Sequence, residues 1–374
     1  MKWLKQLFAR IRKWWTKHKP AFLDRWAKKI RSYNLSRNIG IDLGTASVLV
    51  YVQGKGIVLQ EPSVVAIDTN TDKILKVGKE AQQMLGRTPG NIAAIRPLRE
   101  GVISQYEVTL KMIQYFIRRA CGNLFFPPRV MICIPSGISE VEERAVVDAA
   151  KEAGAHKCYL IEEPKAAAIG AGLDIYQPKG SLVVDIGGGT TDIAVLSLGG
   201  VVVSRSIKIA GDKFDEAIMR YVRRKYSVLI GERTAEEVKK HIGSVYRSSE
   251  ELSVDVKGRC MNTGLPKVIR LRSHEMIEAL AEPVTEILNA VCFVIENTPP
   301  ELLGDILKQG IVMTGGGSLL RGFDQLVEQA TGIPTRIADD PISCVAIGTG
   351  LSLEHLDMMR EGTLNLARDR KARA

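Results

Sequence analysis

The chain has 374 residues, of which 45% are hydrophobic and 25% are charged, and its formal net charge is +10. This length exceeds the usual size of one domain, so we expect two. The six cysteines are scattered, with no Cys-x-x-Cys pair and no histidine nearby at metal-ligand spacing. They predict buried, reduced thiols rather than disulfides or a zinc site, which favours a cytosolic protein.

The excess of positive charge lies at the N-terminus. Residues 1–37 carry twelve Lys and Arg and a single acid, Asp24, whereas the rest of the chain carries 40 basic and 41 acidic residues. The body of the protein is therefore close to neutral. A nucleic-acid groove on the body is not indicated, and no nucleic-acid partner is expected.

Apolar residues recur at helical spacing within this basic arm, with an interruption at Pro20, and all four tryptophans of the chain lie there. A basic amphipathic helix with Trp and Phe on its apolar face is typical of a membrane surface. No apolar run approaches the roughly 20 residues that a spanning helix needs. A helix docked on the body or on a partner, or a flexible tail, are the alternatives. The candidate membrane residues are Trp3, Leu4, Leu7, Phe8, Ile11, Trp14 and Trp15.

Two segments of the body share one pattern: a strand rich in β-branched residues that ends at an Asp, a Gly-rich turn that carries Thr, and a returning strand. The first covers residues 38–52 with Asp42 before the turn, and the second covers residues 181–196 with Asp185 in the same place. Glycine lets a phosphate approach the backbone N–H groups of such a turn. The Asp puts a hard oxygen ligand where Mg²⁺ would sit. The repeat predicts a duplicated domain with a nucleotide clamped between the halves.

Strands alternate with helices through the body. Helices are expected at residues 79–85, 107–120, 139–153 and about 212–226, a buried strand at 129–135, and an inserted polar subdomain at about 231–274. The alternation predicts an α/β fold with an Asp-bearing sheet in each half.

Two acids, Glu162 and Glu163, directly precede an Ala-rich helix start at residues 164–172. One interpretation is structural, because acids complement the positive end of a helix. The other is that one carboxylate orients or deprotonates the water that attacks a γ-phosphate. The residues alone leave both open.

A third glycine cluster, Gly315 to Gly317, follows a strand at residues 310–314 and leads into a helix at about 322–331. A Gly turn at a helix start is a ready site for a nucleotide. Such turns also serve packing alone, so this motif by itself is weak evidence.

In this order, the motifs resemble those of the actin/sugar-kinase/chaperone ATPase superfamily and are similar above all to the MreB-type bacterial actins. They are Asp-Leu-Gly-Thr, Glu-Glu-Pro-x-Ala-Ala-Ala-Ile-Gly, Asp-Ile-Gly-Gly-Gly-Thr-Thr-Asp and Thr-Gly-Gly-Gly-Ser-Leu-Leu-Arg-Gly, and the resemblance covers about residues 38–355. It implies a two-domain, actin-like ATPase fold made of duplicated RNase H-like domains. The expected divisions are an amphipathic extension at 1–37, domain I at 38–180 with an insertion at about 68–104, domain II at 181–355 with an insertion at about 218–280, and a basic tail at 356–374.

The resemblance also implies roles by position. Asp42 and Asp185 lie near Mg²⁺, and Glu163 places the attacking water with help from Thr190. The residues implied to hold ATP are Gly44, Thr45, Ala46, Gly187, Gly188, Gly189, Thr190, Glu236, Lys239, Gly315, Gly316, Gly317 and Ser318. In MreB-type proteins a hydrophobic loop at the place of residues 123–128 dips into the membrane, which adds the candidates Leu124, Phe125 and Phe126.

The function implied is a slow ATPase whose turnover regulates polymerisation. Such a protein is cytoplasmic and peripheral on the inner leaflet of the cytoplasmic membrane, where its filaments organise cell-wall synthesis and rod shape; its partners are copies of itself and the cell-wall elongation machinery. A non-polymerising chaperone-type ATPase is disfavoured because no substrate-binding domain follows Leu356. A sugar or small-molecule kinase is disfavoured because no acidic sugar-binding loop is evident. Both are kept as alternatives.

Overall fold

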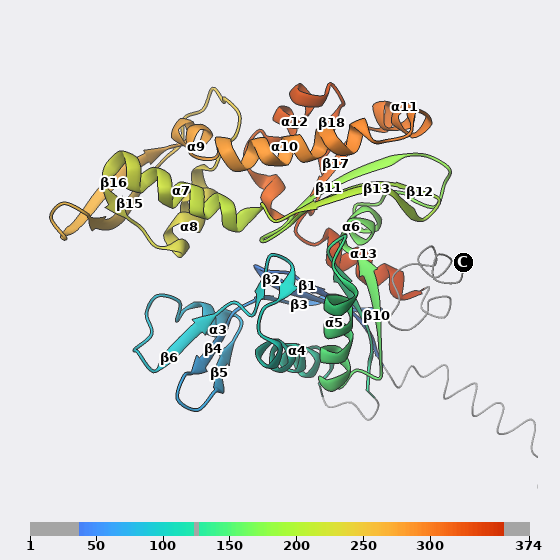
Figure 1. Ribbon diagram of the computed structural model, residues 1–374, viewed down its shortest axis with the longest axis horizontal. Coiled ribbons are helices and arrows are strands. Elements are labelled where there is room, and N and C mark those ends of the chain that lie inside the picture. Colours follow the sequence, from blue (N-terminus) through green and yellow to red (C-terminus); the bar gives the residue numbers. More distant parts are fainter. Residues whose placement is uncertain (1–36, 123–126, 355–374) are drawn as a thin grey trace, which may run out of the picture.

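The computed structural model describes residues 37–122 and 127–354, which form two α/β domains, each built on a five-stranded sheet (Figure 1). The N-terminal sheet has the order β10-β9-β1-β2-β3 and the C-terminal sheet has the order β13-β12-β11-β17-β18. The first contains β1 (Asn38–Leu43), β2 (Ser47–Val52), β3 (Gly56–Pro62), β9 (Arg129–Ile134) and β10 (Lys157–Glu162). The second contains β11 (Ser181–Ile186), β12 (Thr191–Ser197), β13 (Gly200–Ile207), β17 (Ile311–Thr314) and β18 (Thr335–Ile337).

The two sheets share one topology. In each, three consecutive strands pair antiparallel, and two later strands add in parallel on the other side of the first strand. The shared order confirms the predicted duplication. Every residue of β11 is buried, as expected for a strand of an α/β sheet that is covered on both faces.

The helices pack on the sheets and on one another. They are α4 (Tyr106–Cys121), α5 (Glu140–Glu152), α7 (Gly211–Tyr226), α10 (Ala281–Glu296), α11 (Pro300–Gln309) and α12 (Phe323–Thr331). The start of α5 is a capping box, since the Ser139 hydroxyl accepts from the Glu142 N–H and the Glu142 carboxylate accepts from the Ser139 N–H at 2.7 Å. Within the two described ranges, none of the helices reaches the length and apolarity needed to cross a membrane.

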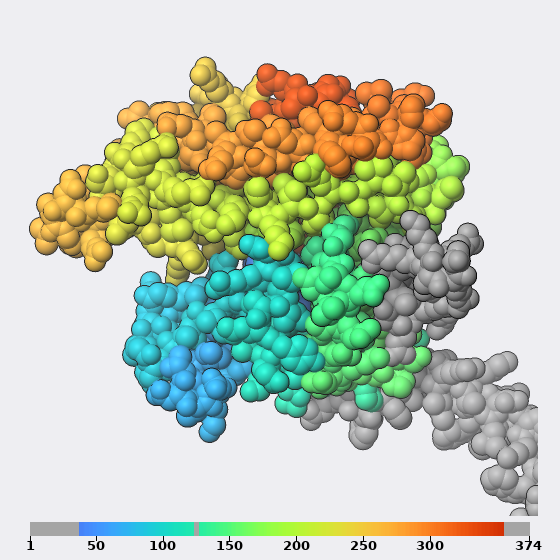
Figure 2. Space-filling model, viewed as in Figure 1, coloured from blue at the N-terminus to red at the C-terminus, as the bar shows by residue number. Residues whose placement is uncertain are grey.

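Two helices cross at the junction of the domains, α6 (Glu163–Gly170) and α13 (Cys344–Ser352). A Cβ on Gly170 would lie 1.8 Å from the Cys344 carbonyl oxygen, and one on Gly348 would lie 1.8 Å from that of Ala166. Only glycine fits such a close backbone approach. Because α6 contacts β11 and β12 while α13 contacts β1 and β2, the crossing joins the two halves. Figure 2 shows the halves meeting along a seam.

Each domain carries an insertion, and both lie at the same end of the molecule (Figure 1). The first contains β4 (Val65–Asp68), β5 (Lys73–Val77), α3 (Lys79–Gln82) and β6 (Ile92–Ile95), and is followed by the pair β7 (Leu98–Arg99) and β8 (Val102–Ile103). The second contains β14 (Val228–Leu229), α8 (Glu232–Ile242), β15 (Ser253–Cys260), β16 (Pro266–Arg272) and α9 (Ser273–Ala279).

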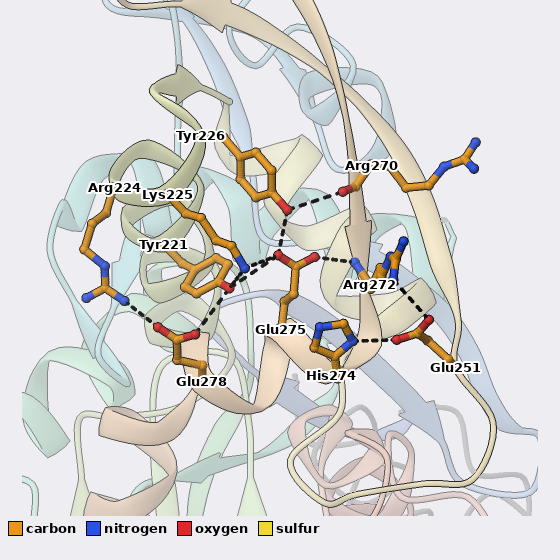
Figure 3. A network of polar contacts seen from close by, with 10 residues as sticks. All are labelled: Tyr221, Arg224, Lys225, Tyr226, Glu251, Arg270, Arg272, His274, Glu275 and Glu278. Atoms are coloured by element: carbon orange, nitrogen blue, oxygen red, sulfur yellow. Dashed lines mark hydrogen bonds and ion pairs between the residues drawn. The ribbon is translucent and has the colours of Figure 1, made fainter.

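A polar network fixes the second insertion on α7 (Figure 3). The Glu275 carboxylate, 4% exposed, accepts hydrogen bonds from Lys225 Nζ at 2.7 Å, Tyr226 Oη at 2.6 Å and the Arg272 N–H at 2.8 Å. Burial alone would raise the pKa of Glu275, but the hydrogen bonds from Lys225 and Tyr226 outweigh it and lower the pKa. Arg224 and Glu278 add an exposed ion pair at 3.1 Å. All these contacts lie within one domain.

The six cysteines are free thiols; five are buried and Cys292 is half-buried. The predicted burial of the thiols is therefore confirmed for five of the six.

Candidate functional site

A cavity of about 870 Å³ lies between the two domains, a size that suits a small-molecule ligand. Both Gly-rich hairpin turns and the third glycine cluster line it, so the three motifs meet although they lie far apart in the chain. The predicted site residues that line the cavity are Asp42, Gly44, Thr45, Ala46, Glu163, Asp185, Gly187, Gly188, Gly189, Thr190, Glu236, Lys239, Gly315, Gly316 and Gly317.

The two hairpin turns are in direct contact. A Cβ on Gly188 would lie 2.5 Å from the Cβ of Ala46, and one on Gly189 would lie 2.5 Å from Thr45 Oγ1. No side chain fits at either glycine without moving the opposite turn. The backbones of both turns therefore come together at the cavity wall, as a bound phosphate chain requires.

Asp42 and Asp185 end equivalent strands, β1 and β11, and face the same cavity. Burial raises the pKa of Asp42 to about 7, and the nearby charge of Asp185 adds to this rise. Burial also raises the pKa of Asp185 to about 6, although Thr314 Oγ1 donates to its Oδ1 at 2.9 Å. Two carboxylates that repel each other in a buried cleft form a site that a divalent cation would neutralise.

The donor set fits magnesium bound together with a phosphate. Within residues 37–122 and 127–354, no group of three His, Cys, Asp or Glu side chains could hold a metal by itself. Mg²⁺ in proteins usually keeps several waters and is bound by one or two carboxylates and the phosphates of the substrate. Asp42, Asp185 and the glycine cradle between them match that pattern.

Glu163 begins α6 and lines the cavity beside these aspartates. Burial, followed by the charges of Asp192, Asp42 and Asp185, raises the pKa of Glu163 well above its usual range. Its neighbour Glu162 occupies the N-cap position, yet its side chain makes no capping hydrogen bond. A helix-start acid that lines a cavity and is hard to ionise is typical of a reactive carboxyl group rather than of a solvated helix end.

Asp192 is a buried acid whose charge acts on Glu163 and to which the sequence analysis assigns no role. It is 1% exposed, and its Oδ1 accepts from the Ser136 N–H of the other domain at 2.8 Å. Burial raises its pKa to about 7. Asp192 pairs directly with Asp185 in the β11–β12 register, so strand pairing was the signal that could have identified it.

Lys239, which also lines the cavity, is held in place rather than free. Its Nζ donates to the Gly211 carbonyl at 2.8 Å and to Asp215 Oδ2 at 2.9 Å. Burial raises the pKa of Asp215 to about 6, although the Lys239 charge opposes the rise. Asp215 is a cavity residue absent from the sequence prediction.

Two further lining residues absent from the prediction are Arg96 and Asp212. Ser318, by contrast, was expected at the cavity and is not among its lining residues. It is fully buried, and its hydroxyl donates to the Gly315 carbonyl at 2.7 Å. Its contact therefore supports the turn.

The candidate membrane residues fall in two segments of the chain. Those of the arm (Trp3, Leu4, Leu7, Phe8, Ile11, Trp14 and Trp15) and those of the loop (Leu124, Phe125 and Phe126) lie outside the described residues.

Comparison with known proteins gives one consistent result. A family model described as MreB/Mbl protein matches residues 36–361. The cell shape-determining protein Mbl of Bacillus cereus is 53% identical over 330 residues, 88% of this chain and 99% of the relative. The cell shape-determining protein MreB of Escherichia coli K12 is 53% identical over 337 residues, 88% of this chain and 97% of the relative. Crystal structures of MreB5 of Spiroplasma citri, one bound to ADP and one to AMPPNP, match with a TM-score of 0.83 and 42% identity over 86% of this chain and 97% of theirs.

Proposed function

The chain belongs to the MreB/Mbl family, and from that membership we propose that it is an ATP-dependent, actin-like filament protein that determines cell shape. The observation that carries the proposal is the facing pair of Asp-bearing Gly turns, which close one cavity between duplicated sheets. Its filaments lie on the inner face of the cytoplasmic membrane and organise cell-wall synthesis together with the elongation machinery.

The ligand that fits the cavity is ATP with Mg²⁺. The Gly turns would hold the phosphates, Asp42 and Asp185 would hold the cation, and Glu236 and Lys239 would contact the nucleoside. The metal supplies positive charge that offsets both the phosphates and the two aspartates. The structure of the S. citri relative with AMPPNP supports the assignment of a nucleoside triphosphate.

Glu163 is the carboxyl group that orients the attacking water and accepts its proton, with Thr190 beside it. Without bound nucleotide, burial and three neighbouring acids raise the pKa of Glu163 well above its usual range. Neutralisation of Asp42 and Asp185 removes two of the three charges that raise its pKa. Nucleotide and cation would therefore make Glu163 easier to ionise, which favours its role as the base in the loaded cleft.

Sedimentation tests the function directly. With Mg²⁺ and ATP, the full chain should pellet above a critical concentration and stay in the supernatant without nucleotide. A chaperone-type ATPase would hydrolyse ATP without pelleting, and a small-molecule kinase would transfer phosphate to an acceptor. Either result would contradict the filament proposal.

Deletion of residues 1–36 should lower the affinity for vesicles rich in anionic lipid at least tenfold. The arm's basic residues contribute about 1 kcal/mol each near an anionic surface, and salt screens this attraction. All four tryptophans lie in the deleted segment, so Trp emission of the full chain should shift to the blue on these vesicles. Neutral vesicles are the control. Unshifted emission in low salt, or equal binding by both chains, would refute the membrane arm.

A further inference from the structure

The segment after β6 of domain I reaches across the cleft to domain II. Arg96 Nη1 donates to Asp212 Oδ1 at 2.8 Å, and both side chains line the cavity. Asp212 lies in the first turn of α7, whose N-terminus is tied to the phosphate turn because the Asp212 N–H donates to the Gly188 carbonyl at 2.8 Å. We propose that Arg96 and Asp212 form a latch that keeps the domains closed over the nucleotide, which makes Arg96 a positioning residue that governs nucleotide release. This inference rests on the proposed nucleotide-binding function.

The rest of the same segment supports a closing role. The Gly101 N–H donates to Thr45 Oγ1 at 3.2 Å in the first phosphate turn. A Cβ on Gly101 would lie 2.9 Å from Thr190 Cγ2 in the second turn. Residues 96–101 thus touch both turns at once, so the two domains can move apart at this place only if the segment separates from domain II.

Burial decides which interdomain ion pair dominates. The side chains of Arg96 and Asp212 are 23% and 32% exposed, whereas a second interdomain pair, Lys208 and Glu100 at 3.1 Å, is 62% and 49% exposed. Exposed pairs contribute little because water and salt screen them, and a partly buried pair is screened much less. Burial raises the pKa of Asp212, and the charge and hydrogen bond of Arg96 oppose that rise. The Arg96–Asp212 pair therefore carries most of the electrostatic closure.

The test is the dissociation rate of a fluorescent ATP analogue, loaded with Mg²⁺ and chased with unlabelled ATP. Arg96→Ala and Asp212→Ala should each release it about tenfold faster than the wild-type chain. The double alanine variant should be no faster than either single variant, because both remove the same interaction. The exchanged pair, Arg96→Asp with Asp212→Arg, should return the rate to within about threefold of wild type, and Arg96→Lys should recover part of it.

Arg224→Ala is the matched control. It breaks an ion pair with Glu278 that lies wholly within domain II (Figure 3), so the release rate should stay that of the wild type. Melting curves without nucleotide check that every variant is folded.

Wild-type release rates in both alanine variants would overturn the latch. Fully additive effects, or an exchanged pair that stays as fast as the single variants, would also overturn it, because Arg96 would then act on the nucleotide directly through its Nε–H, which has no hydrogen-bond partner among the described residues. A wild-type chain that fails to bind the analogue would instead refute the proposed function.

Discussion

Asp185→Asn should abolish measurable binding of Mg²⁺·ATP and, in the same variant, raise the thermal stability of the nucleotide-free protein. Asparagine keeps the size of the side chain and can still accept the hydrogen bond from Thr314, so the fold is preserved. It lacks the negative charge that a cation needs. It also removes a buried carboxylate that repels Asp42. Binding and stability should thus change in opposite directions, as expected for a strained functional site.

The sign of the stability change follows from the pKa. Burial raises the pKa of Asp185 from 3.8 to about 6 in the folded chain. The stability that this group contributes is therefore present below pH 3.8 and is lost as the pH rises through about 6. At pH 8 Asp185 is ionised in the wild-type apoprotein. Its burial then lowers the free energy of unfolding by at most about 3 kcal/mol for a shift of this size. The melting temperature of the variant should exceed that of wild type at pH 8, and the gap should narrow toward pH 5.

The same carboxylates predict a pH dependence of binding in the wild type. Asp42, whose pKa is about 7, must lose its proton before it can face a cation. Affinity for Mg²⁺·ATP should therefore fall about tenfold between pH 8 and pH 6.

Calorimetric titration and thermal melting measure both effects. Asp255→Asn is the control. Asp255 lies on β15, forms an exposed ion pair with Arg270 and is not among the cavity residues. Binding by Asp185→Asn within twofold of wild type would contradict the cleft assignment. A less stable apoprotein at pH 8 would contradict the electrostatic account.

Local chemistry explains what could be predicted from the sequence. Each hairpin is specified by neighbouring residues, a β-branched strand, an Asp and a Gly turn, so its form and its ligand could be inferred before any tertiary contact was known. The duplicated architecture follows from the repeat of that unit, and the two sheets confirm it with equivalent strand order. The actin-like fold was implied by the resemblance of the motifs.

The residues that the sequence analysis missed depend on how the two domains meet. Asp192 and Arg96 have partners 56 and 116 residues away in the chain. A periodic pattern in the sequence does not indicate contacts between residues that are so far apart. Ser318 is not among the lining residues of the cavity for a local reason. It lies in a 3₁₀ turn, Gly316–Leu319, where three residues complete a turn, and its hydroxyl bonds back to the turn instead of facing the cavity.

Glu163→Gln should slow phosphate release from bound ATP by about 100-fold or more, because loss of a general base costs roughly 10² to 10⁴ in rate. Glutamine keeps the volume of the side chain and can still hydrogen-bond water, but it cannot accept the proton. Nucleotide affinity should stay within about threefold of wild type, since Asp42, Asp185 and the glycine turns are untouched. Single-turnover hydrolysis, measured beside equilibrium binding, separates the two effects.

The adjacent acid provides the control. Glu162 precedes Glu163 in the chain but is not among the cavity residues, so Glu162→Gln should hydrolyse ATP at close to the wild-type rate.

Asp192→Asn tests whether Glu163 or its neighbour Asp192 is the base. Asp192 raises the pKa of Glu163 through its charge and is not among the cavity residues, so its loss should move the rising limb of the pH–rate profile to lower pH and leave hydrolysis intact. If Asp192→Asn abolished turnover while Glu163→Gln did not, the base would be Asp192 and the assignment of Glu163 would be wrong.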